Sequence, residues 1–180
     1  RRNTGRIASG LRDLGVGEGD RVAAYMPNVP ETIAAFLACT SIGAVWSCAA
    51  PEFGTGAVID RFTQIEPVVL LAADGYRYGG KDFNRSDEAA EIAATISAQL
   101  VKFGHLDGAG WPRDFGADPE PLSFAHVPFS HPLWVLYSSG TTGLPKAIVH
   151  SHGGILLEQL KSAGLRLDAS AGDRVFWFTT

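Results

Sequence analysis

The chain has 180 residues, of which 46% are hydrophobic and 19% charged, and this is enough apolar material to bury the core of one α/β domain. Its formal net charge is −4, with fifteen Lys and Arg residues scattered among nineteen Asp and Glu residues. This balance argues against a nucleic-acid partner, because binding to a phosphate backbone relies on clustered basic side chains. No apolar run approaches the length of a membrane span, so no membrane partner is expected.

The two cysteines, Cys39 and Cys48, lie inside apolar stretches, with no CxxC spacing and no neighbouring histidine. This pattern is typical of buried, reduced thiols and provides no metal-ligand set. We therefore expect a cytoplasmic protein whose own residues hold no metal ion.

Strand and helix patterns alternate along the first hundred residues. The expected elements, in chain order, are a helix over 1–15, a strand over 21–26, a helix over 29–43, a strand over 45–49, a helix over 56–64, a strand over 68–72, a helix over 86–98 and a strand over 100–103. Asn28 is expected to cap the second helix, with Glu31 completing a capping box, and Ser86 to cap the fourth. The second helix is expected to bury Ile33, Phe36, Leu37 and Thr40.

Residues 104–131 are rich in proline and glycine and predict a long surface connection within one domain. Regular patterns then resume, with strands expected over 132–137 and 147–150, a helix over 153–165 and a last strand over 174–178. We expect Trp177 and Phe178 to be core residues of that strand. Strands that alternate with helices favour a mostly parallel sheet with helices on both faces, which is an α/β fold.

The segment between the strands over 132–137 and 147–150 combines hydroxyls, glycines and one lysine, which is the chemistry of a triphosphate-binding loop. The glycines let a ligand approach the backbone, the hydroxyls donate hydrogen bonds, and the lysine supplies a compact positive charge. The residues concerned are Ser138, Ser139, Gly140, Thr141, Thr142, Gly143 and Lys146. A plain polar turn without a ligand is the alternative interpretation. The spacing matches neither the Walker A loop nor the dinucleotide fingerprint.

The order Tyr-Ser-Ser-Gly-Thr-Thr-Gly-x-Pro-Lys over 137–146 resembles the phosphate loop of the adenylate-forming superfamily, which includes acyl-CoA synthetases, luciferases and peptide-synthetase adenylation domains. Further runs resemble the N-terminal domain of acyl-CoA synthetases in the same order: GDRV at 19–22, MPNVPE at 26–31, SIGAV at 41–45 and DRFTQIEP at 60–67. The likeness covers nearly the whole chain. Within the superfamily, residues 136–150 and 50–54 are most similar to the acetoacetyl-CoA synthetases. Acetyl-CoA synthetases come second, because they usually have Thr at the position of Ser138 and Ser at that of Thr141.

The resemblance implies a two-step reaction. A carboxylate, expected to be acetoacetate, attacks the α-phosphate of ATP and releases pyrophosphate, and the thiol of coenzyme A then attacks the acyl-adenylate. Lys146, Thr141 and Thr142 are the implied catalytic residues, since they would stabilise charge on the departing pyrophosphate while Mg²⁺ bridges the phosphates. Acetate or another short-chain acid is the alternative substrate.

A second implied site lies in the run Tyr76 to Lys81. The resemblance places a basic loop here that contacts the nucleotide phosphates of coenzyme A, with Arg77 and Lys81 as the matching residues. Two solvated surface cations are the alternative interpretation. His150 and His152 lack a third ligand at useful spacing, so a structural role at the turn and helix start is expected for them.

The resemblance also implies that residues 1–180 are part of a large N-terminal AMP-binding domain. The adenine-binding segment, the ribose-binding aspartate, the hinge and the C-terminal domain with its catalytic lysine would belong to the remainder of the protein. We therefore expect the fragment alone to be inactive and to need this missing C-terminal part as its partner. A stand-alone phosphate-binding α/β module without catalysis is the alternative.

Overall fold

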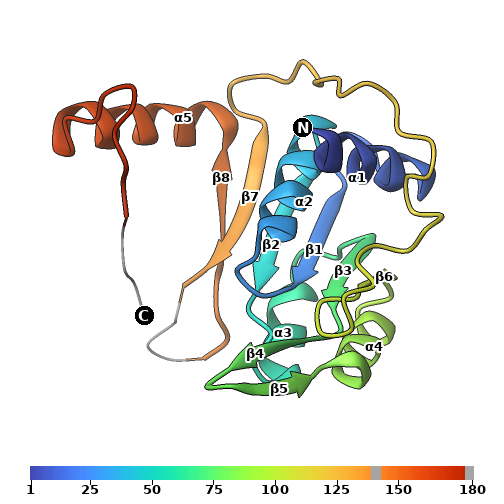
Figure 1. Cartoon of the computed structure of the whole chain (residues 1–180). Helices are drawn as coiled ribbons and strands as arrows, with labels where there is room; N and C mark the ends of the chain where they lie inside the picture. The colour runs from blue at the N-terminus through green and yellow to red at the C-terminus, as the bar shows by residue number, and fades with distance from the viewer. Residues whose placement is uncertain (139–142, 177–180) are drawn as a thin grey trace.

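A computed structural model describes residues 1–138 and 143–176, and its main feature is a six-stranded sheet (Figure 1). The strand order is β6-β3-β1-β2-β7-β8, in which β8 is antiparallel to β7 and the other neighbouring pairs are parallel. The strands are β1 (Arg21–Tyr25), β2 (Val45–Ala49), β3 (Val69–Ala73), β6 (Gln99–Phe103), β7 (Pro132–Tyr137) and β8 (Ala147–Ser151). The predicted mostly parallel sheet is therefore confirmed.

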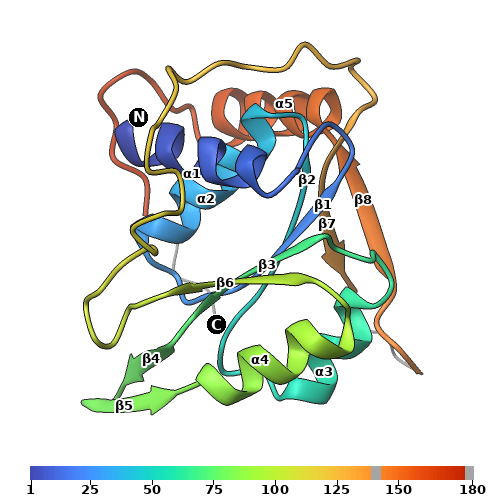
Figure 2. The same cartoon turned by 90° about the vertical axis from the view of Figure 1, so that its right-hand side faces the viewer.

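Helices cover both faces of this sheet (Figure 2). The covering helices are α1 (Arg2–Asp13), α2 (Pro30–Ser41), α3 (Thr55–Phe62) and α4 (Ser86–Thr95). A fifth helix, α5 (His152–Lys161), follows β8, extends away from these two cores and continues into a π-helical turn over Ser162–Arg166. Side chains of α1 and α2 pack on one face, and side chains of α3 and α4 pack on the other. The strands β1 and β3 lie between these two cores, which explains their continuous apolar sequences. None of the helices in the described ranges is long and apolar enough to cross a bilayer.

The strand register aligns the carboxyl ends of the parallel strands. Tyr25 pairs with Ala49 of β2 and with Ala72 of β3, and Ala73 pairs with Phe103 of β6. The junction between β2 and β7 is sparser, because only Trp46 pairs with Trp134. There the Ser47 hydroxyl donates a hydrogen bond to the Val135 carbonyl oxygen (3.0 Å), so a side chain supplements the backbone ladder.

The connection over 104–131 crosses the surface as predicted, but side chains fix its course. Phe115 is buried against Gly10 of α1, where an added Cβ would lie 2.6 Å from the phenyl ring. Arg6 Nε donates to the Phe115 carbonyl oxygen (3.0 Å), and Arg6 Nη2 donates to that of Pro112 (2.7 Å). The segment is thus a surface connection held against α1 by side-chain contacts.

The predicted buried face of α2 is wrong for two of its four residues. Ile33 and Leu37 are 53% and 48% exposed, whereas Phe36 and Thr40 are half-buried. The buried residues of this helix are small: Ala35, Ala38, Cys39 and Ser41. Small side chains let the helix approach the sheet and α1 closely. The small volume of these side chains, and not their apolar character, therefore determines which face of α2 is buried.

Both predicted helix caps are also wrong. The N-cap of α2 is Val29, and the helix begins at Pro30, whose fixed φ suits the first helical position. In α4 the residue Ser86 is the first helical residue, and its N–H donates to the Asn84 side-chain oxygen (2.8 Å). Asn84 therefore performs the role that the sequence pattern assigned to Ser86.

Three other outcomes differ from the sequence analysis. A hairpin of β4 (Gly75–Tyr78) and β5 (Lys81–Asn84) was not predicted. Cys39 is buried as expected, but Cys48 is exposed. Residues 174–176 are not in a strand, and Val175 and Phe176 are exposed. The prediction for Trp177 and Phe178 lies outside the described residues.

Truncation of matched leucines tests these helix faces. Leu11→Ala in α1 removes a fully buried side chain and should lower the free energy of unfolding by about 2–5 kcal/mol. Leu37→Ala in α2 should lower it by less than about 1 kcal/mol, because half of that side chain already contacts water. Urea titration of the 180-residue chain measures both values, and equal losses would contradict the assigned faces.

Candidate functional site

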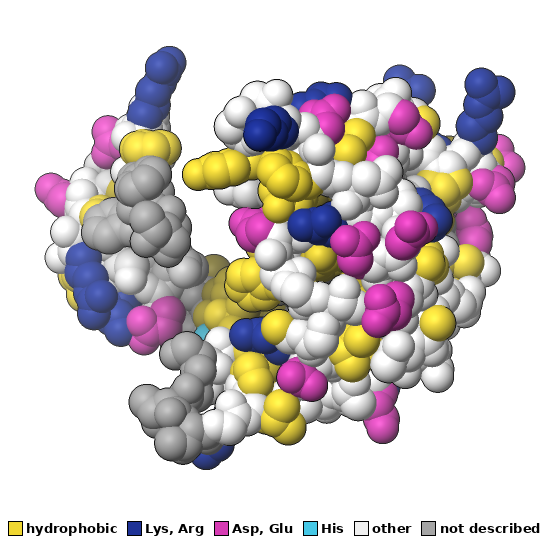
Figure 3. Space-filling view, turned by 90° about the horizontal axis from the view of Figure 1, so that it is seen from below, with side chains coloured by type: hydrophobic (Ala, Val, Ile, Leu, Met, Phe, Trp, Pro, Cys, Tyr) yellow, Lys and Arg dark blue, Asp and Glu magenta, His cyan; other side chains and the backbone are white. Residues whose placement is uncertain are grey.

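The loops that follow the parallel strands meet at one edge of the sheet. They comprise residues 26–29 after β1, 50–54 after β2, the β4–β5 hairpin after β3, residues 104–107 after β6 and the loop that begins at Ser138 after β7. Figure 3 shows this side of the molecule, where basic and acidic side chains are interspersed among apolar ones. Ligands of open α/β sheets bind outside the carboxyl ends of the strands, so this edge is the candidate site.

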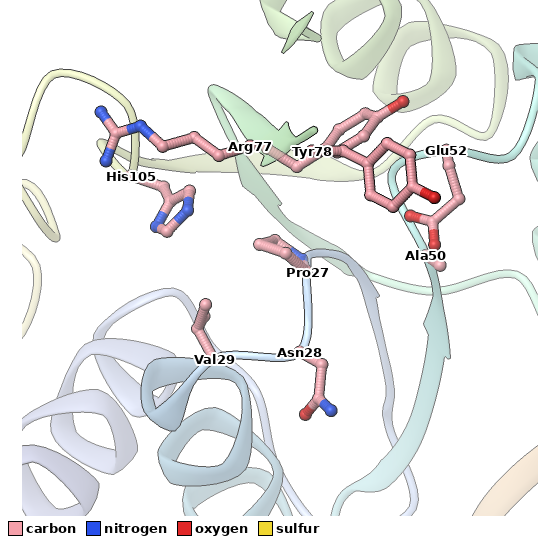
Figure 4. A pocket seen from close by; sticks show the side chains of 9 residues that line it. Pro27, Asn28, Val29, Ala50, Glu52, Arg77, Tyr78 and His105 are labelled. Carbon is pink, nitrogen blue, oxygen red and sulfur yellow. The ribbon is translucent and has the colours of Figure 1, made fainter. Parts of the chain in front are cut away.

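A pocket of about 630 Å³ opens at this edge (Figure 4). It lies at the end of β1, where the chain continues into α2 on one face while the neighbouring β2 and β3 lead to α3 and α4 on the other. Connections that diverge in this way leave a crevice between adjacent strands. The pocket is lined by Pro27, Asn28, Val29, Ala50, Glu52, Tyr76, Arg77, Tyr78 and His105.

The lining combines a cation, aromatic rings and hydrogen-bonding groups. In Figure 4, Arg77 and His105 lie together on one side of the pocket, and Glu52 lies on the other. A guanidinium binds phosphate oxygens, and an exposed ring such as that of Tyr78 can stack on a base. This chemistry suits a phosphorylated nucleotide.

Arg77 is held in place from two sides. Its Nε donates to Asp82 Oδ1 on β5 (2.9 Å), and its Nη2 donates to the Leu106 carbonyl oxygen (2.8 Å). The ion pair is exposed and adds little stability, so its main effect is on the orientation of the guanidinium. Lys81 faces Tyr78 across the hairpin and does not line the pocket. The structure therefore brings Arg77 to the candidate site and leaves Lys81 at the hairpin turn.

The turn over 50–54 is anchored from below by two residues that the sequence analysis missed. The fully buried Tyr25 directs its hydroxyl to the carbonyl oxygens of Pro51 (2.7 Å) and Phe53 (3.0 Å). Burial raises the pKa of Tyr25, which keeps this hydroxyl protonated as a donor. Arg85 Nε donates to the Pro51 oxygen as well (3.0 Å), and its guanidinium lies over the Tyr76 ring. These contacts join segments that are far apart in the chain, so they could not be predicted from a local sequence pattern.

The loop of 138–146 is described at its base. The Ser138 N–H donates to the Lys146 carbonyl oxygen (3.1 Å), and Gln64 Nε2 of the segment after α3 donates to the Pro145 carbonyl oxygen (2.8 Å). Gly143 has a φ of 103°, a conformation that favours glycine, and the Lys146 side chain is exposed. The candidate residues Ser139, Gly140, Thr141 and Thr142 lie outside the described residues.

The turn over 50–54 lies between the pocket and the loop. Ala50 and Glu52 line the pocket, whereas Phe53 contacts the guanidinium of Arg61 (5.3 Å to the ring centroid). The same guanidinium lies 6.0 Å from the centroid of Tyr137, the last residue before the loop. The turn therefore lines the pocket directly and reaches the residue before the loop through Arg61.

The histidines near β8 lie at the opposite edge and have structural contacts. Trp134 Nε1 donates to His150 Nδ1 (2.8 Å), while His152 begins α5 and its ring lies tilted against that of His131 (5.7 Å between ring centroids). The Ser151 hydroxyl caps α5 by accepting the Gly154 N–H (3.1 Å). These contacts agree with the expected structural role. Within residues 1–138 and 143–176, no group of three or more His, Cys, Asp or Glu side chains could hold a metal ion.

Comparison with known proteins identifies what this arrangement is similar to. A family model described as "AMP-binding enzyme" matches residues 1–180. Acetoacetyl-coenzyme A synthetase of Rhizobium meliloti (strain 1021) is 44% identical, over 97% of this chain and 29% of that protein. The solved acetoacetyl-CoA synthetase of Streptomyces lividans superposes with a TM-score of 0.90 at 48% identity, over 99% of this chain and 29% of that one.

A more distant solved structure, ATP-bound MatB from Rhodopseudomonas palustris, superposes with a TM-score of 0.74 at 26% identity over 89% of this chain and 30% of that one. The chain thus spans somewhat under a third of the length of the relatives it matches. These likenesses agree with the resemblance found in the sequence.

Burial of His152 predicts a pH-dependent stability. Desolvation and the neighbouring His131, itself 3.9 Å from Glu18, lower the pKa of His152 below 6.5. The unfolded chain then binds more protons than the folded chain, so the free energy of unfolding should decrease as the pH falls below about 6.5. His152→Gln should show a smaller decrease, whereas His126→Gln, at an exposed position, should behave as the parent. Urea titrations from pH 7.5 to 5 test this, and identical pH slopes for all three chains would refute it.

Proposed function

We propose, from the premise that this chain belongs to the AMP-binding enzyme family, that the protein is an acid–thiol ligase which activates acetoacetate with ATP and transfers the acyl group to coenzyme A. The observation that carries this proposal is the placement of the loop and the Arg77 pocket on one edge of one sheet, with the turn over 50–54 and Arg61 between them. The relatives named acetoacetyl-CoA synthetase, with 44% and 48% identity, support the choice of acid.

In the first half-reaction, an oxygen of the acetoacetate carboxylate forms a bond to the α-phosphorus of ATP, and the bond to the bridging oxygen of pyrophosphate breaks. Negative charge then develops on the leaving pyrophosphate. Lys146, the residue before β8, supplies positive charge, and we assign Thr141 and Thr142 as hydroxyl donors to the same group. Lys146 acts as an electrostatic stabiliser and not as a base, since the negative charge that it meets develops on the departing pyrophosphate.

The remaining loop residues bind the nucleotide phosphates in this proposal. They are Ser138, Ser139, Gly140 and Gly143. Two hydrogen bonds fix the base of the loop, one from the Ser138 N–H to the Lys146 carbonyl oxygen and one from Gln64 to the Pro145 carbonyl oxygen. The two ends of the loop are therefore held by the sheet and by the segment after α3. The name of the related ATP-bound structure agrees with ATP as the nucleotide. Mg²⁺ would enter with ATP as part of the substrate and would neutralise charge on its phosphates.

In the second half-reaction, the thiol sulfur of coenzyme A forms a thioester with the acyl carbon, AMP leaves, and the thiol proton is released. The pocket of about 630 Å³ is our candidate for the nucleotide end of coenzyme A. Arg77 would bind its phosphates and Tyr78 would stack on its base. Lys81, at the hairpin turn, would contribute long-range attraction only.

The rest of the protein completes this account. We assign residues 1–180 to part of the N-terminal AMP-binding domain, and the catalytic elements that these residues lack to the remainder of the full-length chain. The 180-residue chain alone would then not turn over. We place the protein in the cytoplasm, with its small-molecule substrates and its own C-terminal part as partners and no nucleic acid or membrane among them.

Pyrophosphate exchange on the full-length protein tests the activity. Acetoacetate should support ATP–pyrophosphate exchange better than acetate does, and Lys146→Ala should slow the exchange about a hundredfold, as expected for loss of one stabilising group. Lys102→Ala, which removes an exposed lysine of β6, is the matched control. A preference for acetate would assign a different acid, and the absence of any exchange would leave a non-catalytic phosphate-binding module.

A second pair of variants separates the two basic residues of the hairpin. Arg77→Gln should raise the KM for coenzyme A about tenfold, because it removes a guanidinium that lines the pocket. Lys81→Gln should change it less than about twofold, since this side chain lies outside the lining. Equal effects of the two variants on the initial rate at varied coenzyme A would contradict the assignment.

A further inference from the structure

A carboxylate outside the pocket lining, that of Asp74, binds the backbone of the turn that forms one wall of the pocket. Asp74 follows β3 directly, and its Oδ1 accepts the backbone N–H groups of His105 (2.8 Å) and Leu106 (2.8 Å). Its Oδ2 accepts the N–H of Asp107 at a longer distance (3.3 Å). A carboxylate that accepts several backbone N–H groups fixes the path of that backbone, because its bonds are charge-assisted.

The turn that Asp74 fixes supplies two features of the pocket. His105 lines the pocket directly. Arg77 Nη2 donates a hydrogen bond to the Leu106 carbonyl oxygen (2.8 Å), and the Leu106 N–H donates to Asp74 Oδ1. The position of the Arg77 guanidinium is therefore coupled to Asp74 through one residue of the turn.

Two glycines mark where the segments around Asp74 approach each other closely. A Cβ on Gly75 would collide with the Phe83 carbonyl oxygen and the Leu106 side chain, and a Cβ on Gly104 would collide with the Asp107 carboxylate. The backbones on both sides of Asp74 are thus in close contact, and glycine at 75 and 104 permits this approach.

The sheet itself does not need this carboxylate. The β3–β6 ladder continues to the pair Ala73 with Phe103, and the Asp74 N–H donates to the Phe103 carbonyl oxygen (2.9 Å) through the backbone alone. The Asp74 carbonyl oxygen likewise accepts the Arg85 N–H (2.7 Å), a bond that any residue would keep. Loss of the side chain would therefore release the turn and leave the strands paired.

We propose that Asp74 is a positioning residue of the coenzyme A pocket, which holds the turn over 105–107 and through it His105 and Arg77. This inference rests on the proposed function, because it assigns the pocket to the nucleotide end of coenzyme A. Asp74 acts on the second half-reaction only, since the loop of 138–146 is anchored by other residues.

The test uses the full-length protein with Asp74→Ala, Asp74→Asn and, as matched control, Asp118→Asn at an exposed position of the 104–131 connection. Asp74→Ala should raise the KM for coenzyme A about tenfold with kcat nearly unchanged, as expected for loss of charge-assisted hydrogen bonds. Asp74→Asn keeps one acceptor oxygen and should raise the KM less. Acetoacetate-dependent ATP–pyrophosphate exchange, which needs no coenzyme A, should stay at the parent rate in all three variants.

The outcomes separate the inference from the function on which it rests. An unchanged KM in Asp74→Ala would overturn the positioning role. A parallel loss of pyrophosphate exchange would overturn it as well, because it would assign Asp74 to the stability of the whole domain. If the parent protein catalyses neither exchange nor thioester formation, the proposed function fails, and that result appears in the parent before any variant is compared.

Discussion

The parallel alignment of β1, β2, β3, β6 and β7 is the constraint on which the rest of the structure depends. Parallel strands need crossover connections, and the helices that make them bury both faces of the sheet. Alignment in register then brings the loops after Tyr25, Ala49, Ala73 and Phe103 to one edge. The pocket and the loop of 138–146, which are far apart in sequence, share this edge because the carboxyl ends of the parallel strands all meet there.

The turn over 50–54 gives this shared edge a further property. The hydroxyl of the buried Tyr25 donates hydrogen bonds to carbonyl oxygens of this turn. Residues of the turn line the pocket, and its Phe53 contacts Arg61. Arg61 lies in turn over Tyr137 at the entrance to the loop. In the proposed reaction the two half-reactions use the loop and then the pocket, so the turn offers a physical connection between the two sites.

Much of the fold could be predicted from the sequence, because periodicity reports burial directly. The strands β1, β2, β3 and β7 and the helices that cover both faces were recognised from continuous or periodic apolar runs. The sequence predicts a phosphate-binding loop over 138–146 because the relevant chemistry is concentrated in nine consecutive residues. Patterns of this kind lie within a short stretch of sequence, so they can be recognised without knowledge of the tertiary structure.

The errors arise where tertiary packing decides the outcome. The face of α2 could not be predicted, since Ile33 and Leu37 are more apolar than the alanines that the sheet and α1 accept. The two strands of the β4–β5 hairpin have four residues each, and most of these residues are exposed or half-buried. The hairpin therefore lacks the apolar pattern from which a strand is predicted. Tyr25 and Asp74 act on segments 26 to 33 residues away, and no single-sequence pattern reveals such contacts.

The central proposal is that the carboxyl edge of the sheet carries both the ATP site and the coenzyme A site, and that coenzyme A binds in the pocket at the end of β1. A crystal structure of the full-length protein with coenzyme A bound tests it most directly. The account predicts electron density for the nucleotide phosphates beside Arg77 and His105, in the pocket that Asn28 and Glu52 also line. Coenzyme A bound at another surface, with this pocket occupied by solvent, would contradict it.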